Sequence, residues 1–149
     1  MADSDNIAIA RRLYEDWNKR DFDHLASLLA DDGQILLVGS GTSFRGPDGA
    51  RQFADMWATG FPDGRVTIER EAASGGQVTI EHTGTGTHTG PLQSPGGDIP
   101  ATGKSVTLQL CDVFTIEGGK IKSMRSYFDS ASLLTQIGVL PAAGVATAS

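Results

Sequence analysis

The first third of the chain has apolar residues at three- and four-residue spacing, the pattern of amphipathic helices. In the first such segment they are Ile7, Ala10, Leu13, Tyr14 and Trp17. A polar joint at 19–21 interrupts the pattern, and residues 22–29 predict a second, shorter helix that ends near Asp32. A brief strand is expected at 34–38, followed by a loop. A third helix is expected from Pro47 to about Thr59, because proline fits the first turn of a helix.

The second half of the chain alternates between apolar and polar residues, which is typical of strands. The predicted strands are Arg65–Ala72, Gln77–Thr89, Ser105–Glu117 and Lys120–Phe128. Tight glycine turns at 75–76 and 118–119 predict antiparallel pairing of successive strands. A short apolar helix, Ser130–Ile137, follows. Helices first and strands afterwards predict an α+β fold, with N-terminal helices packed on a strongly curved antiparallel sheet.

Length and charge restrict the class of protein. The 149 residues fit one domain, expected over residues 1–140, with a flexible tail of small residues at 141–149. A net charge of −6 without a Lys/Arg cluster argues against nucleic-acid binding. No apolar run approaches the roughly 18 residues of a membrane helix, and the acidic, polar start does not resemble a secretory signal. We therefore expect a cytoplasmic protein that binds neither nucleic acid nor membrane.

Cysteine and histidine usage gives no sign of a metal site. The one cysteine, Cys111, cannot form an internal disulfide, and no Cys/His spacing resembles a zinc site. We expect no metal and no cofactor. The outward face of the strand around Cys111 is uncharged and rich in β-branched residues: Thr107, Gln109, Cys111, Val113 and Thr115. A solvent-facing strand usually carries more charge, so this row predicts a homodimer or a higher even oligomer packed sheet to sheet.

Several titratable residues fall on the inward phase of the predicted strands. His82 and His88 share the phase of Val78 and Ile80, and Asp112 is the one charged group in an otherwise apolar row. An unpaired carboxylate there would cost several kcal/mol, so it needs partners or a raised pKa. Alternation from Ile121 places three further candidates on one face of the last strand. They are Arg125, Tyr127 and Asp129.

Each of these residues also has a structural interpretation. An inward histidine can be a hydrogen-bonded core residue, Asp112 can pair with Arg125, and Asp129 can cap the helix that follows it. Together, however, His82, His88, Asp112, Arg125, Tyr127 and Asp129 predict a pocket, because several titratable groups inside an apolar hollow are costly without a function. Aromatic residues of the helices would line one side of it, or simply fill the core. They are Tyr14, Trp17, Phe53 and Trp57.

A set of segments occurs in an order that resembles the SnoaL-like polyketide cyclases, within the superfamily of nuclear transport factor two and ketosteroid isomerase. The segments are Phe44–Pro47, Gly84–Leu92 (GTGTHTGPL), Pro100–Lys104, Gly118–Ile121, Tyr127–Asp129 and Leu133–Gly138. The resemblance covers roughly residues 5 to 140 and implies a cone-shaped α+β barrel. It also implies that Asp129 is the general acid/base and that His88 lines the pocket. Asp112 stands where the cyclases carry another pocket histidine.

The activity implied by this resemblance is an aldol-type ring closure within one hydrophobic carbonyl molecule, a polyketide-like or aromatic ester, without a cofactor. Asp129 would remove a proton next to a carbonyl, and His88, Asp112 or Tyr127 would donate to the developing oxyanion. His82, Arg125 and the four helix aromatics would bind substrate, and the 91–103 segment would gate access. A cofactor-independent hydroxylase, an isomerase and a non-catalytic binding protein remain as alternatives.

Overall fold

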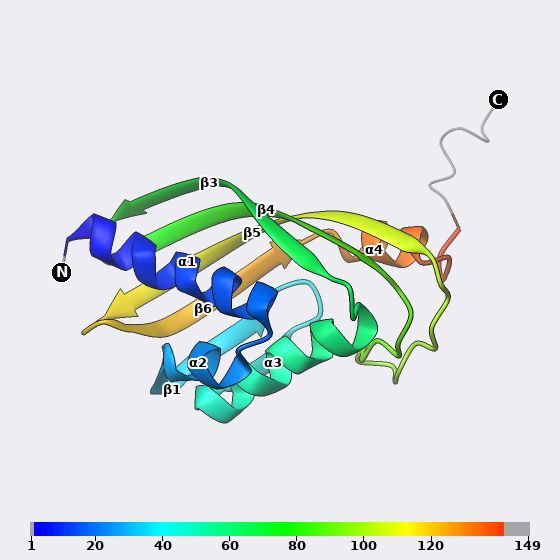
Figure 1. The fold of residues 1–149 in the computed structure, drawn as a ribbon, viewed down its shortest axis with the longest axis horizontal. Helices are drawn as coiled ribbons and strands as arrows, with labels where there is room; N and C mark the ends of the chain where they lie inside the picture. The colour runs from blue at the N-terminus through cyan, green and yellow to red at the C-terminus, as the bar shows by residue number, and fades with distance from the viewer. Residues whose placement is uncertain (1, 142–149) are drawn as a thin grey trace.

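The computed structural model describes residues 2–141, and it places the helices and the sheet as separate layers (Figure 1). The helices are α1 (Asp3–Lys19), α2 (Phe22–Ser27), α3 (Gly46–Gly60) and α4 (Ser130–Gln136). The strands are β1 (Leu29–Leu37), β2 (Thr42–Arg45), β3 (Arg65–Ser74), β4 (Gln77–Thr87), β5 (Ser105–Glu117) and β6 (Lys120–Phe128). The predicted tail at 141–149 lies outside the described residues except for Pro141.

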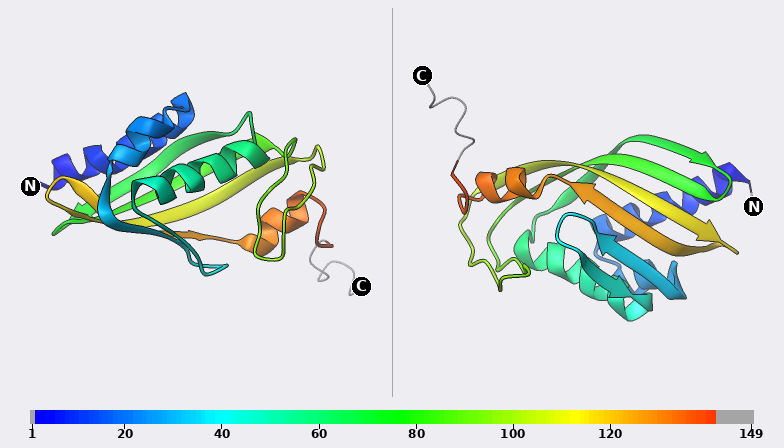
Figure 2. Two further views of the ribbon diagram at one scale, coloured as in Figure 1. Left: turned by 90° about the horizontal axis from the view of Figure 1, so that it is seen from below. Right: turned by 180° about the vertical axis from the view of Figure 1, so that it is seen from behind.

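The six strands form one curved sheet in the order β2-β1-β6-β5-β4-β3. All neighbours are antiparallel except β1 and β6, which run parallel. The predicted α+β class is confirmed, but the sheet is mixed rather than wholly antiparallel and is open rather than a closed barrel. Helices α1, α2 and α3 cover one face of the sheet, and α4 lies at its far end (Figure 2).

The core forms where the apolar stripes of α1 and α3 face the sheet. Ala10, Leu13 and Tyr14 are buried, as their helical spacing predicts. The Trp17 indole N–H donates to the carbonyl of Ala54 over 3.2 Å and so ties α1 to α3. This fixed pair of helices holds the aromatic side chains of both against the inner face of the sheet.

The chain leaves the second helix earlier than its apolar pattern predicts. Helix α2 ends at Ser27 and β1 begins at Leu29, because Leu29 pairs with Ile121 of β6 and the Ile121 N–H donates to the Leu28 carbonyl. The predicted loop at 39–42 is followed by a strand that the sequence pattern does not indicate, since residues 42–45 form β2 against β1. The long segment after β4 contains one isolated bridge, between Leu92 and Ile99.

A bulge reverses the side-chain phase of β6. Thr115 of β5 faces Ser123, yet Ile116 faces Ile121, so β6 contains one extra residue at this point. After the bulge, Met124 and Ser126 are buried. The prediction that Arg125, Tyr127 and Asp129 point inward is therefore wrong: all three are exposed.

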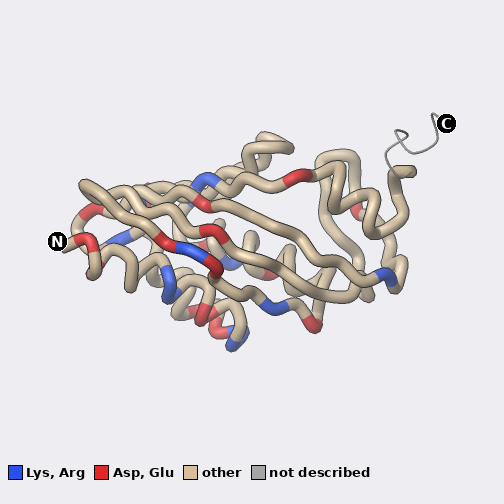
Figure 3. The backbone as a smooth tube through the Cα atoms, turned by 90° about the horizontal axis from the view of Figure 1, so that it is seen from above, with Lys and Arg blue, Asp and Glu red and all other residues tan. Residues whose placement is uncertain are grey.

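Acidic and basic residues are interspersed along the described backbone (Figure 3). Within residues 2–141, no helix has both the length and the apolar character needed to cross a membrane.

Candidate active site

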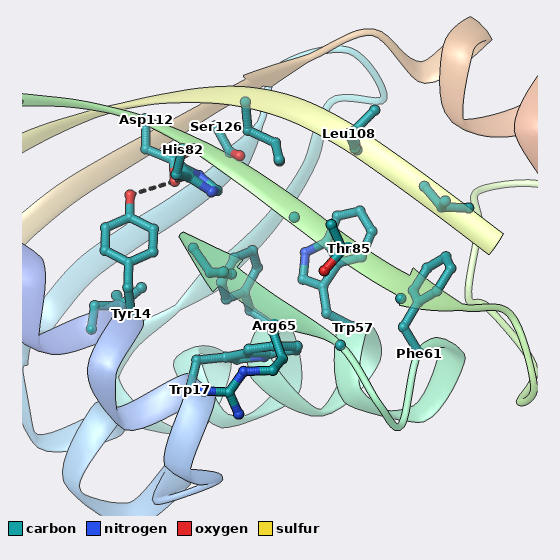
Figure 4. A pocket seen from close by; sticks show the side chains of 18 of the residues that line it. Tyr14, Trp17, Trp57, Phe61, Arg65, His82, Thr85, Leu108, Asp112 and Ser126 are labelled. Atoms are coloured by element: carbon teal, nitrogen blue, oxygen red, sulfur yellow. Dashed lines mark hydrogen bonds and ion pairs between the residues drawn. The ribbon is translucent and has the colours of Figure 1, made fainter. Parts of the chain in front are cut away.

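A cavity lies between the helices α1 and α3 and the inner face of strands β4, β5 and β6 (Figure 4). It contains about 720 Å³ not occupied by protein atoms, its open mouth included. Most of its wall is apolar. Six of the predicted site residues line it: Tyr14, Trp17, Phe53, Trp57, His82 and Asp112. A concave apolar cavity with a few polar groups is the usual form of a small-molecule site.

The polar groups meet on the carboxylate of Asp112. The Tyr14 hydroxyl donates to Asp112 Oδ2 over 2.6 Å, and His82 Nε2 lies 2.7 Å from the same oxygen. The three residues come from α1, β4 and β5, and Asp112 is 1% exposed. This arrangement satisfies the requirement, evident from the sequence, that an inward carboxylate must have partners.

Two acceptor positions of the cluster remain open. With Nε2–H donated to Asp112, the Nδ1 atom of His82 carries a lone pair, and neither it nor Asp112 Oδ1 has a hydrogen-bond partner within residues 2–141. Both atoms are buried. Burial raises the pKa of Tyr14 well above its usual value, and the Asp112 carboxylate raises it further, so Tyr14 stays a donor. The cluster therefore holds a buried, unpaired nitrogen that can take up a proton.

Ring packing holds the cluster in place. The Tyr14 and His82 rings lie with centroids 4.7 Å apart, and Tyr14 contacts the edge of Phe114 with centroids 6.1 Å apart. Such aromatic contacts restrict ring rotation and add about 0.5–1.5 kcal/mol each. The Tyr14 hydroxyl and the His82 ring are thus oriented before any ligand arrives.

Sequence reasoning missed Ser126, a hydroxyl next to the cluster. Ser126 is the cross-strand partner of Asp112, is buried and lines the same cavity. Its inward position results from the β6 bulge, which strict alternation does not reveal. The helical spacing indicates Tyr14 only as part of an aromatic wall, because nothing local shows that its hydroxyl reaches a strand 98 positions later.

Four predicted site residues lie elsewhere. Asp129 is the N-cap of α4, where its carboxylate accepts the Ser132 backbone N–H over 3.1 Å. Arg125 and Tyr127 lie together on the outer face, with the guanidinium carbon 5.7 Å from the ring centroid. None of these three lines the cavity. The expected convergence of all six titratable residues is wrong for them, and the helix-cap interpretation of Asp129 is the one that the structure matches.

His88 is inward, as predicted, but it does not line the cavity. Its Nδ1 lies 3.0 Å from the Thr102 hydroxyl, and the Thr102 backbone N–H donates to it over 3.3 Å. The ring packs against Phe61, with centroids 5.6 Å apart. His88 thus ties the beginning of the segment after β4 to its end, shortly before β5.

No group of three or more His, Cys, Asp or Glu side chains within the described part of the chain is arranged to hold a metal ion.

Comparison with known proteins gives a family and a shared fold. Residues 7–137 match the family model described as SnoaL-like polyketide cyclase. A protein from Jannaschia sp. CCS1, assigned as a SnoaL-like polyketide cyclase, superposes with a TM-score of 0.82 at 21% identity, covering 93% of this chain and 95% of that one. AclR from Streptomyces galilaeus, assigned as a hydroxylase, gives 0.81 at 18% identity, covering 99% and 89%.

An epoxide hydrolase of the LEH-like type from M. tuberculosis gives a TM-score of 0.69 at 21% identity, covering 99% of this chain and 98% of that one. At these identities the solved structures share the fold with this chain, while their assigned reactions differ from one another. No curated protein sequence matches the chain.

Proposed function

Because this chain belongs to the SnoaL-like polyketide cyclase family, we propose that it is an enzyme that closes a ring in a hydrophobic carbonyl compound by acid–base catalysis, with His82 and Asp112 as its proton-transfer pair. The observation that carries the proposal is the open Nδ1 of a buried histidine whose other nitrogen is held by a buried carboxylate. A carboxylate that orients a histidine and stabilises its protonated form is a recurrent arrangement for a general base.

The proposed first step is removal of a proton from carbon next to a substrate carbonyl. His82 Nδ1 takes the proton, and the imidazolium that forms is stabilised by Asp112. The electron pair of the broken C–H bond moves into the carbonyl to give an enolate. The Ser126 hydroxyl, on the neighbouring strand, is a candidate donor to the enolate oxygen.

The proposed second step forms the ring. The enolate carbon attacks a second carbonyl carbon of the same molecule, a C–C bond forms, and the resulting alkoxide takes the proton back from His82. No atom is gained or lost, so the step needs no oxidant or reductant. The apolar walls, with Trp17, Phe53 and Trp57 among them, would hold the two carbonyl groups close together, an effect worth about 7–11 kcal/mol when orientation is ideal.

This proposal places the base at a different residue from the one implied by the family resemblance. Asp129 is exposed, caps α4 and lies outside the cavity lining, whereas His82 and Asp112 are buried within it. A base on Asp129 would require the substrate to bind outside the cavity. The proton-transfer role of Asp129 therefore receives no support from its location.

The proposal is tested by enolisation of a simple ketone that fits an apolar cavity. We expect the wild-type protein to catalyse exchange of solvent deuterium into C2 of 1-tetralone, followed by proton NMR. Changing His82→Ala or Asp112→Asn should reduce the exchange rate by roughly 10²- to 10⁴-fold. Asp129→Asn serves as the matched control, since it removes a carboxylate outside the cavity.

Two results would overturn the assignment. Full exchange activity in His82→Ala would remove the histidine as base, and loss of activity in Asp129→Asn alone would return the role to Asp129. Tight 1-tetralone binding without any exchange would instead support the alternative of a non-catalytic binding protein.

A further inference from the structure

A cation stands at the mouth of the otherwise apolar cavity. Arg65 begins β3, pairs with Thr85 of β4, and lines the cavity together with it. The close-up shows the Arg65 side chain beside Trp17 (Figure 4). Arg65 is exposed and is also among the residues that line the cavity, so it stands where the cavity opens to solvent.

Arg65 has neither an ion-pair partner nor a side-chain hydrogen bond within residues 2–141, unlike its neighbour Arg20. The Arg20 guanidinium lies 4.0 Å over the Trp17 ring and donates to the carbonyls of Trp17, Pro62 and Gly64 at 2.8, 2.9 and 2.9 Å. Arg20 is thus fixed in a structural role that holds the 61–65 turn, whereas the five N–H donors of Arg65 remain available.

The two guanidinium groups act on each other. Burial lowers the pKa of Arg20 and the charge of Arg65 lowers it further, while the charge of Asp63 acts in the opposite direction. The nearby acid is Asp63, whose carboxylate already accepts the backbone N–H and the hydroxyl of Thr87 at 2.7 and 2.8 Å. Arg20 and Arg65 are two positive charges, and Asp63 is one negative charge that already accepts hydrogen bonds from Thr87. The mouth of the cavity is therefore positive, although the net charge of the protein is −6.

We propose that Arg65 binds an acidic group of the ligand at the cavity mouth, so that the substrate is an amphiphilic acid: an apolar body in the cavity, with a carboxylate or a similar anion at Arg65. An arginine fork matches the two oxygens of a carboxylate, and Trp17 lines the same cavity, where an aromatic acid can contact it.

The strand register gives the backbone distance between the two positions. Arg65 pairs with Thr85, while Ile68 pairs with His82, so the Cα atoms of Arg65 and Ile68 are three residues apart along β3, about 10 Å. Only the position of the reacting carbonyl, next to His82, rests on the proposed function. The anion site itself does not, because it is defined by the cavity and Arg65 alone.

The experiment compares an acid with its neutral counterpart: 1-tetralone-6-carboxylate and 1-tetralone-6-carboxamide, which carry a ketone at one end and the acid or amide at the other. Both tryptophans of the chain, Trp17 and Trp57, line the cavity, so quenching of intrinsic fluorescence reports binding directly. We expect the wild type to bind the carboxylate about three- to tenfold more tightly than the amide, as befits a partly exposed charge pair. This preference should shrink at high salt.

The decisive variant is Arg65→Gln, which should abolish the preference for the carboxylate while leaving amide binding unchanged. Arg70→Gln is the control, because Arg70 lies on the same strand and gives the same charge change but does not line the cavity. Arg65→Lys should keep a reduced preference.

Equal affinity of the wild type for the carboxylate and the amide would overturn the proposal. An equal loss of the carboxylate preference in Arg65→Gln and Arg70→Gln would overturn it as well. A carboxylate preference that depends on Arg65, found in a protein without deuterium exchange activity, would keep the anion site and refute only the proposed reaction.

Discussion

The Tyr14 hydroxyl lies 2.6 Å from Asp112 Oδ2, joining the first helix to the fifth strand across 98 positions of sequence. Tyr14 is 3% exposed and Asp112 is 1% exposed, so the contact is shielded from water. Because the same oxygen also contacts His82, Tyr14 fixes the carboxylate that orients the proposed base. The helix layer thereby contributes a polar group to a site whose other polar members belong to the sheet.

Removing this hydroxyl should weaken both folding and proton transfer. In Tyr14→Phe the ring packing persists but Asp112 loses one donor, so the free energy of unfolding should fall by roughly 1–3 kcal/mol. Urea denaturation measures this change. The rate of deuterium exchange into 1-tetralone should also fall, while the affinity for 1-tetralone-6-carboxamide should change little. Unaltered stability would show that the contact does not hold the carboxylate.

The raised pKa of Tyr14 predicts a loss of stability in alkali. An unfolded tyrosine releases its proton near pH 10, whereas folded Tyr14 keeps it, because burial and then the Asp112 charge oppose ionisation. Above about pH 10 the unfolded state binds fewer protons than the folded one, so the free energy of unfolding decreases as pH rises. Below about pH 10 Tyr14 is protonated in both the folded and the unfolded state, so it does not make the free energy of unfolding depend on pH.

Urea denaturation from pH 9 to 11 checks this expectation. The wild type should lose stability more steeply than Tyr14→Phe over this range. The pKa of the Cys111 thiol is also raised, by burial and then by Asp112 and Glu81, and acts in the same direction. Both proteins are therefore compared in a Cys111→Ser background. If the free energy of unfolding fell equally steeply with pH in both proteins, the loss of stability would not come from Tyr14.

Periodicity predicted the parts of the site that lie on uninterrupted elements. The helical spacing placed Tyr14 and Trp17 on the buried face of α1, and strict alternation placed His82 and Asp112 on the inner faces of β4 and β5. Each successive residue turns by a fixed angle around a helix, and in a strand it points to the side opposite to the residue before it. Along such uninterrupted segments, the position of a residue in the sequence therefore predicts whether its side chain is buried.

Counting fails where the chain inserts a residue. The bulge between Ile121 and Ser123 exchanges the two faces of β6, which brings Ser126 inward and turns Arg125 outward. No glycine or proline marks it at this point of the strand, which lies between β1 and β5 in the sheet. The parallel β1–β6 pair likewise depends on contacts between distant segments, which local patterns do not encode.

Substitutions of Asp129 distinguish a helix-capping role from the role of a catalytic base. Asn can accept the Ser132 N–H as Asp does, so Asp129→Asn should leave stability nearly unchanged, whereas Asp129→Ala should lose about 1 kcal/mol. Because Asp129 lies outside the cavity lining, both variants should keep deuterium exchange with 1-tetralone. If Asp129 were the general base that the family resemblance implies, the Asn variant would lose roughly 10²- to 10⁴-fold in exchange rate. Such a loss in the Asn variant, with stability intact, would refute the cap assignment.

The outer face of β5 predicts self-association. Thr107, Gln109 and Thr115 are exposed, and Cys111 and Val113 are half-buried, so the uncharged row does face away from the helices. We propose that two copies pack through this row, since its uncharged, β-branched side chains gain by excluding water, with Glu81 of β4 and Arg125 of β6 beside it on the same face. Light scattering at micromolar concentration should give the mass of a dimer or a higher even oligomer. Val113→Lys would bury a charge at the centre of the contact and should give a monomer.

Ser74→Lys, at the end of β3, adds the same charge away from this row and should remain associated. Each variant should keep its far-ultraviolet circular dichroism, which shows that any change in mass comes from the interface rather than from unfolding. A wild-type protein with the mass of a monomer at micromolar concentration would refute the sheet-to-sheet dimer. Dissociation of both lysine variants would assign the effect to net charge instead of to the β5 face.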